Sequence, residues 1–122
     1  MKSFSILVVD DSAAMRSLLV STLETLGPLN IVQAPNGFEA LRMLPREHID
    51  LVLTDINMPD INGLELLSFI RSNPIYKNVP VVVISTEGSR KDIEKGLTLG
   101  ANEYLVKPFN PEQLLEIVKR FL

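Results

Sequence analysis

The sequence has no cysteine, no tryptophan and a single histidine among its 122 residues. Without cysteine there can be no disulfide bonds and no thiolate metal sites, as is usual for cytosolic proteins. Long apolar runs are also missing: the stretch from Phe4 to Val9 soon meets Asp10 and Asp11, too early for a signal peptide or a membrane span. We therefore expect a cytoplasmic protein that does not enter the membrane.

Charge of one sign is not in large excess either. The formal net charge is −3, which argues against direct, non-specific binding of nucleic acid. The apolar fraction of 46% and the charged fraction of 22% are ordinary for a globular protein. A chain of this length can bury about two-thirds of its unfolded surface. We expect residues 1–122 to form one domain and the protein to be a monomer.

Apolar segments suited to buried strands alternate with segments of helical periodicity. The strands are expected at Ser5–Val9, Asn30–Ala34, Leu51–Thr54, Val79–Ile84 and Glu103–Val106. Helices are expected after Ser12, after Gly37, after Gly63, from Arg90 to Leu99, and after Asn110. The alternation predicts a doubly wound α/β fold, with a five-stranded parallel sheet and helices on both faces.

The periodicity also predicts which helical side chains are buried. Apolar residues at helical spacing include Leu18, Phe38, Phe69, Ile93 and Leu97. Since only the last two mark an apolar face between residues 90 and 99, that helix is expected to be the most mobile one. The segment Asn30–Ala34 is half polar and is expected at an edge of the sheet.

Polar or charged groups follow four of the strands, at Asp10 and Asp11, at Asp55, at Ser85 and at Lys107. Alone, each is best read as a turn residue, a helix cap or a solvated side chain. On adjacent strand ends, however, three carboxylates would repel one another unless a cation or raised pKa values relieved them. Mg²⁺ is the simplest cation, with Mn²⁺ as an alternative, and His48 is read as a surface residue.

Mg²⁺, a carboxylate, a lysine and a hydroxyl can together serve one reaction. Asp55 would attack a phosphoryl group in line, while the metal and Lys107 stabilise the charge on its oxygens. In this interpretation Ser85 offers its hydroxyl to the same anion.

Four motifs in this order resemble the receiver domain of two-component response regulators, most of all the single-domain chemotaxis (CheY-like) type. They are Val8-Val9-Asp10-Asp11-Ser12, Asp55-Ile56-Asn57-Met58-Pro59 with Gly63, Ser85-Thr86-Glu87, and Tyr104-Leu105-Val106-Lys107-Pro108-Phe109. The resemblance covers essentially the whole chain and implies the flavodoxin-like strand order 2-1-3-4-5.

The resemblance implies that Asp55 accepts a phosphoryl group from the phosphohistidine of a sensor histidine kinase. The metal would be bound by Asp11, by Asp55 and by the backbone carbonyl of Asn57, with Asp10 acting mostly through water. Asn57 and Glu87 occupy positions that tune the loss of the phosphate.

The resemblance also assigns the switch. Lys107 would pair with the phosphoryl oxygens, Ser85 would move toward them, and Tyr104 would turn inward. This would change the surface formed by the fourth helix, the fifth strand and the last helix. The peptide bond before Pro108 would be cis. Thr86 stands where many relatives have alanine, which affects the expected rates rather than the reaction.

Three functions remain open: two are functions of a receiver domain, and one is a competing enzyme activity. The first is a stand-alone switch, not an enzyme beyond its own phosphorylation and dephosphorylation, that binds a target such as the flagellar motor switch. The second is a receiver module of a longer regulator with a DNA-binding or enzymatic output domain. The third is a phosphohydrolase with Asp55 as nucleophile, which is disfavoured because Asn57, not an acid, stands two residues later.

Overall fold

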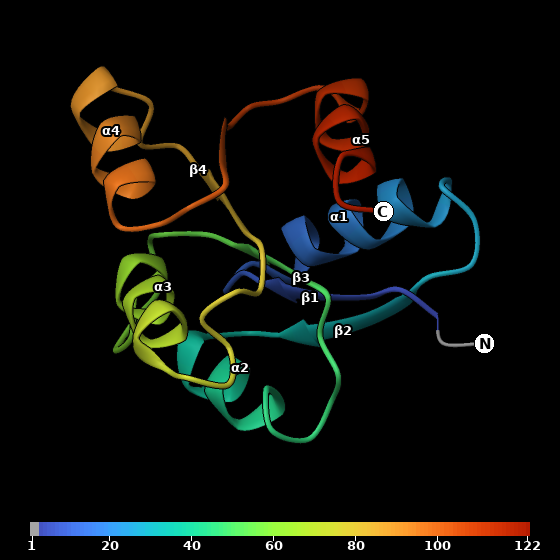
Figure 1. The fold of residues 1–122 in the computed structure, drawn as a ribbon. Coiled ribbons are helices and arrows are strands. Elements are labelled where there is room, and N and C mark those ends of the chain that lie inside the picture. The colour runs from blue at the N-terminus through green and yellow to red at the C-terminus, as the bar shows by residue number, and fades with distance from the viewer. Residues whose placement is uncertain (1–2) are drawn as a thin grey trace.

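The chain forms a five-stranded parallel sheet flanked by five helices in a computed structural model that describes residues 3–122 (Figure 1). The strands are β1 (Ser5–Val9), β2 (Asn30–Ala34), β3 (Leu51–Thr54), β4 (Val81–Ser85) and β5 (Glu103–Val106). The helices are α1 (Ala13–Glu24), α2 (Gly37–Met43), α3 (Gly63–Ser72), α4 (Arg90–Thr98) and α5 (Pro111–Lys119). The strand order is β2-β1-β3-β4-β5, so the predicted fold class and order are confirmed.

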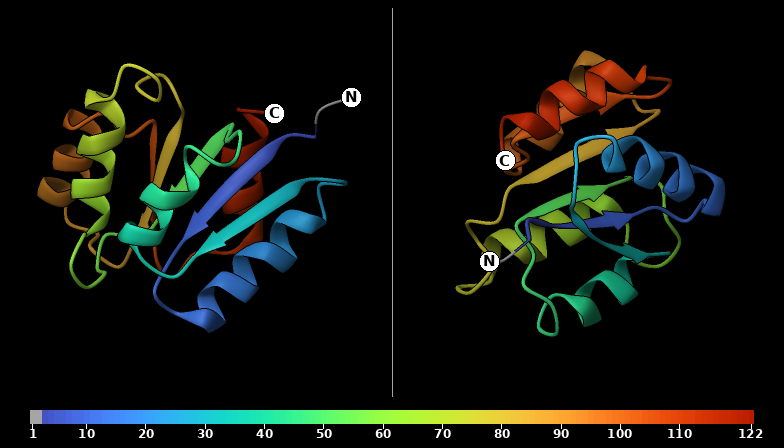
Figure 2. Two further views of the ribbon diagram at one scale, coloured as in Figure 1. Left: turned by 90° about the horizontal axis from the view of Figure 1, so that it is seen from below. Right: turned by 90° about the vertical axis from the view of Figure 1, so that its right-hand side faces the viewer.

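Helices cover both faces of the sheet (Figure 2). The side chains of α1 and α5 pack on one face together with Leu51, Leu53 and Val82. Those of α2 and α3 pack on the other face, and α4 lies on this second side next to the edge strand β5. Every residue of β1, β3 and β4 is buried, as expected for central strands of a parallel sheet. The half-exposed strand β2 lies at an edge, as predicted.

Polar caps fix the point at which each helix begins. An Asn or Ser side chain accepts a hydrogen bond from the backbone N–H three residues later at every helix N-terminus. The caps are Ser12, Asn36, Asn62, Ser89 and Asn110. Each of these helices therefore starts directly after a loop at the carboxyl edge of the sheet, where the polar side chains predicted from the sequence also lie.

The structure corrects the bounds of the fourth strand. It begins at Val81 and includes Ser85, whereas the sequence predicted Val79 to Ile84. Pro80 has no N–H to donate to a ladder, although its carbonyl accepts a hydrogen bond from Val52 N at 2.9 Å. Ser85 is thus held in the strand rather than in the loop.

The structure also corrects the buried faces of the helices. Four apolar side chains at helical spacing are exposed: Phe38 by 61%, Leu18 by 46%, Leu97 by 44% and Phe69 by 41%. The prediction that they are buried is therefore wrong for one residue in each of α1, α2, α3 and α4. The buried residue of α4 is Gly96. The helix meets the sheet at the edge strand β5, where a side chain at Gly96 would touch the ring of Tyr104, so a small residue suits the contact. Among residues 3–122, no helix combines the length and apolar character that a membrane crossing requires.

Candidate functional site

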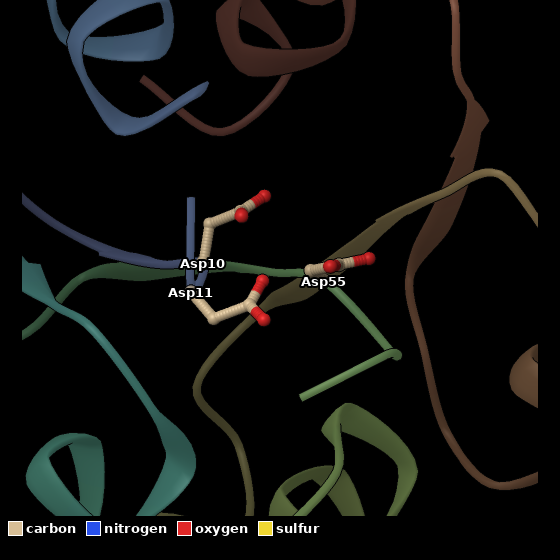
Figure 3. A group of neighbouring side chains, drawn as sticks. All are labelled: Asp10, Asp11 and Asp55. Atoms are coloured by element: carbon tan, nitrogen blue, oxygen red, sulfur yellow. The ribbon is translucent and has the colours of Figure 1, made fainter. Parts of the chain in front are cut away.

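Three carboxylates meet at the carboxyl edge of the sheet. Asp10 and Asp11 follow β1, and Asp55 follows the adjacent strand β3. Each offers one oxygen, and the three oxygens lie within 4.8 Å of one another (Figure 3). Asp10 is 2% exposed and Asp55 is 7% exposed, whereas Asp11 is exposed to solvent. The predicted cluster of acids is therefore confirmed as a geometric arrangement.

Lys107 brings a positive charge to this cluster from the end of β5. Its Nζ donates to Asp10 Oδ2 at 2.9 Å and lies 3.7 Å from Asp55 Oδ1. The backbone N–H of Lys107 donates to the carbonyl of Ser85 at 2.8 Å, and the peptide bond to Pro108 is cis, in agreement with the prediction. One lysine opposes three acids, so the cluster keeps an excess of negative charge.

Burial has the largest effect on the pKa of Asp55. It raises the pKa of this carboxyl group above the usual value of 3.8, against the attraction of Lys107. The neighbouring charge of Asp10 raises the pKa further, while backbone N–H groups of Ile56 and Asn57 lower it. A cation bound at the cluster would stabilise the ionised form of Asp55, because it would offset both the burial and the repulsion.

The donor set of the cluster suits a hard divalent cation. All three side chains offer carboxylate oxygens, and no sulfur or imidazole competes with them in the group. Mg²⁺ needs only one or two carboxylates because it keeps several water ligands, and Mn²⁺ accepts the same donors. The exposure of Asp11 leaves one side of the cluster open to water. The residues present therefore fit the expected metal.

Hydrogen bonds that could not be predicted from the sequence hold the backbone of the loop after β3, next to Asp55. Thr54 Oγ1 donates to the Asp55 carbonyl at 2.9 Å, and Gly63 N donates to the carbonyl of Ile56 at 2.9 Å. A Cβ at Gly63 would lie only 2.0 Å from the Asp55 carbonyl oxygen, so only glycine fits there. Gly63 stood out in the sequence only through its motif.

Ser85, Glu87 and Tyr104 form a connected group beside the acids. Ser85 is fully buried, and its Oγ accepts from Glu87 N at 3.0 Å. The Tyr104 hydroxyl donates to the Glu87 carbonyl, and burial of the ring raises the pKa of Tyr104. Across the mouth of the site, Asn57 Nδ2 donates to Glu87 Oε1 at 3.2 Å. Thr86 is exposed, and His48 lies on the surface, 2.9 Å from Asp50.

Comparison with known proteins identifies this arrangement. Residues 6–119 match the response regulator receiver domain family. The chain belongs to that family.

Several relatives of this receiver domain are chemotaxis proteins. The CheY homolog of Campylobacter jejuni is 40% identical over 112 residues, which are 91% of this chain and 86% of the relative. CheY1 of Helicobacter pylori is also 40% identical, over 91% of this chain and 90% of the relative. Among solved structures, CheY4 of Vibrio cholerae superposes with a TM-score of 0.90 at 36% identity and covers 99% of this chain and 100% of its own.

Proposed function

We propose that this receiver domain is a phosphorylation-dependent switch of a chemotaxis system and that Asp55 is its phosphoacceptor. Three groups support the assignment: the buried carboxylate of Asp55, the acids that can share a cation with it, and Lys107 at 3.7 Å. The names of the relatives support the chemotaxis system. The whole of residues 1–122 acts as a single receiver domain in this proposal.

The proposed reaction transfers one phosphoryl group. An Asp55 oxygen attacks phosphorus, the bond between phosphorus and the donor imidazole of a histidine kinase breaks, and the imidazole leaves with that electron pair and takes up a proton. Asp10, Asp11, Asp55 and the carbonyl of Asn57 would hold a divalent cation, which would supply positive charge to the phosphoryl oxygens when bound. Lys107 stabilises the same oxygens from the other side, since its Nζ already lies beside Asp55.

The proposed response to phosphorylation is a change in the hydrogen bonds that link Glu87 to Ser85 and Tyr104. A phosphoryl group on Asp55 offers new acceptor oxygens to the Ser85 hydroxyl, which now accepts from Glu87 N. Movement of Ser85 would therefore disturb the segment whose carbonyl holds the Tyr104 hydroxyl. The surface of α4, β5 and α5 would change with it and alter binding of a target, for which the flagellar motor switch is the first candidate.

Intact mass spectrometry tests the acceptor. With acetyl phosphate and Mg²⁺, the wild-type chain is expected to gain one phosphate and the Asp55→Asn variant none. Asp60→Asn is a matched control, because it makes the same chemical change at an exposed position in the same loop, where φ is +66° and Asn is well tolerated. Equal addition to the Asp55→Asn variant would overturn the assignment.

Three further observations test the proposed response and separate the alternative functions. After phosphorylation, backbone amide shifts are expected to change at residues 86–106 and in α5 more than in α2; an unchanged α4-β5-α5 surface would contradict the proposed response. Steady turnover of a small phosphomonoester would favour the phosphohydrolase. A reading frame that continues past residue 122 into an output domain would favour the module of a longer regulator.

A further inference from the structure

Arg16 lies in the first part of α1, next to the acids, and is half-buried. Its Nη1 donates a hydrogen bond of 2.6 Å to the backbone carbonyl of Asp10. That carbonyl receives no other hydrogen bond from residues 3–122. The guanidinium lies beyond 4.0 Å from every carboxylate oxygen in the same range, so its observed polar contact is with this backbone oxygen.

The Asp11 carboxylate differs from its two neighbours. Asp10 Oδ1 accepts from Ser12 N at 2.9 Å and Oδ2 accepts from Lys107 Nζ. Asp55 Oδ1 accepts from Ile56 N at 2.8 Å. Within residues 3–122 the carboxylate of Asp11 accepts no hydrogen bond, and it is exposed. Its direction therefore depends on the backbone that carries it.

That backbone is the peptide unit whose carbonyl Arg16 holds. The carbonyl of Asp10 and the N–H of Asp11 belong to one rigid plane, so a hydrogen bond to the carbonyl fixes where the Cα of Asp11 lies. We propose that Arg16 is a positioning residue for phosphoryl transfer, which holds the Asp10–Asp11 peptide so that the Asp11 carboxylate points into the shared cation site. The inference rests on the proposed function of this site.

Calorimetric titration with Mg²⁺ tests the role of Arg16 without any phosphoryl donor. Loss of a group that orients a metal ligand typically weakens binding about 10-fold or more, and this is expected for Arg16→Ala. Charge alone predicts the opposite sign, because removing a cation near three acids should strengthen Mg²⁺ binding. Equal or tighter binding by Arg16→Ala would overturn the proposal. Arg46→Ala, which removes an exposed arginine after α2, is the matched control and should bind like the wild type.

Arg16→Lys keeps a donor and a charge, so it should recover part of the lost affinity and provides a second folded variant. Thermal unfolding without metal checks that both variants are folded. If Arg16→Lys binds no better than Arg16→Ala, the hydrogen bond to the Asp10 carbonyl is not what matters and the proposal fails.

Phosphorylation by acetyl phosphate at increasing Mg²⁺ gives an independent readout. A positioning residue for the metal ligand should lower the rate at limiting Mg²⁺ and leave it unchanged at saturation. A deficit that persists at saturation would mean that Arg16 touches the donor instead, which would overturn the positioning role. If the wild-type chain itself bound no Mg²⁺, the proposed cation site would fail as well, so failure of the two ideas can be told apart.

Discussion

At the scale of single residues, the ionised carboxylate of Asp55 lowers the stability of the folded state, and the size of this effect depends on pH. Burial raises the pKa of its carboxyl group above 3.8, so the folded state binds more protons than the unfolded state just above that pH. Stability should therefore fall as the pH rises from about 3.8 through the raised pKa of the folded state, and the full cost should apply above it. Asp55→Asn removes this cost and is expected to raise the melting temperature by a few degrees at neutral pH without divalent ions.

Thermal unfolding of the wild type and the Asp55→Asn variant between about pH 3 and pH 8 measures this difference. The gain should shrink as the pH falls toward the ordinary range of an aspartate, since both side chains are then neutral. A gain of the same size at every pH would point to packing rather than charge as its cause. Asp60→Asn, at the exposed position in the same loop, should show no such gain.

Substitution of Lys107 by alanine is also expected to change stability, because Lys107 pairs with the buried carboxylate of Asp10. Its side chain is 12% exposed and that of Asp10 is 3% exposed, so Lys107→Ala leaves a buried carboxylate without its cation. Such a loss typically costs about 3 kcal/mol, and chemical denaturation without metal should show a decrease of this order. Because Mg²⁺ can replace the lost positive charge, its affinity should be retained or increased. Weaker Mg²⁺ binding by Lys107→Ala would contradict this account.

At the scale of elements, the two ends of α4 are held differently. Near the C-terminal end of α4, Arg71 of α3 donates to the carbonyl of Gly100 at 2.9 Å and to Asn102 Oδ1 at 2.8 Å. The same guanidinium also donates to the carbonyls of Val79 at 2.6 Å and Lys77 at 3.1 Å, before β4. Asn102 Oδ1 also accepts from Val81 N. The N-terminal end instead follows the segment around Glu87 that borders the acids. A response to phosphorylation should thus move the N-terminal end of α4 about a fixed C-terminal end.

Arg71→Ala tests this anchor. Several partly buried acceptors would lose their donor at once, so a loss of about 2–3 kcal/mol in the free energy of unfolding is expected. Hydrogen exchange should accelerate at residues 99–102 and at the start of β4, but not at the start of α4. Arg42→Ala removes an exposed arginine with one surface ion pair and should change stability by less than about 0.5 kcal/mol. Faster exchange along the whole of α4 would contradict a local anchor.

At the scale of the whole molecule, the sequence predicted the order of elements because buried parallel strands have long apolar runs and each helix starts with a polar cap. It also predicted the cluster of acids, since parallel strands end at one edge of the sheet. It could not predict Arg16 or Arg71, because arginines that donate to distant or buried carbonyls look like ordinary surface charges in a sequence. It misjudged Leu97 because a helix that packs on an edge strand needs only a small contact face.

The fold and the cation site are coupled through the acids, and this coupling can be measured on the whole domain. A ligand that binds only the folded state stabilises it by about 2.7 kcal/mol at one hundred times its dissociation constant. For a domain of this size that corresponds to a rise of roughly 10 °C in melting temperature. Titration with MgCl₂ or MnCl₂ is therefore expected to raise the melting temperature steadily with the logarithm of the metal concentration.

Screening of the repelling acids by salt would also stabilise the domain, so the control is NaCl at matched ionic strength. Site-bound Mg²⁺ should act at concentrations where NaCl does little. Asp11→Asn should reduce the increment, because it removes the exposed carboxylate that completes the cluster while leaving the buried pair of Asp10 and Lys107 in place. If NaCl reproduced the whole increment, or if Asp11→Asn left it unchanged, the cluster would act through general repulsion and not as a cation site.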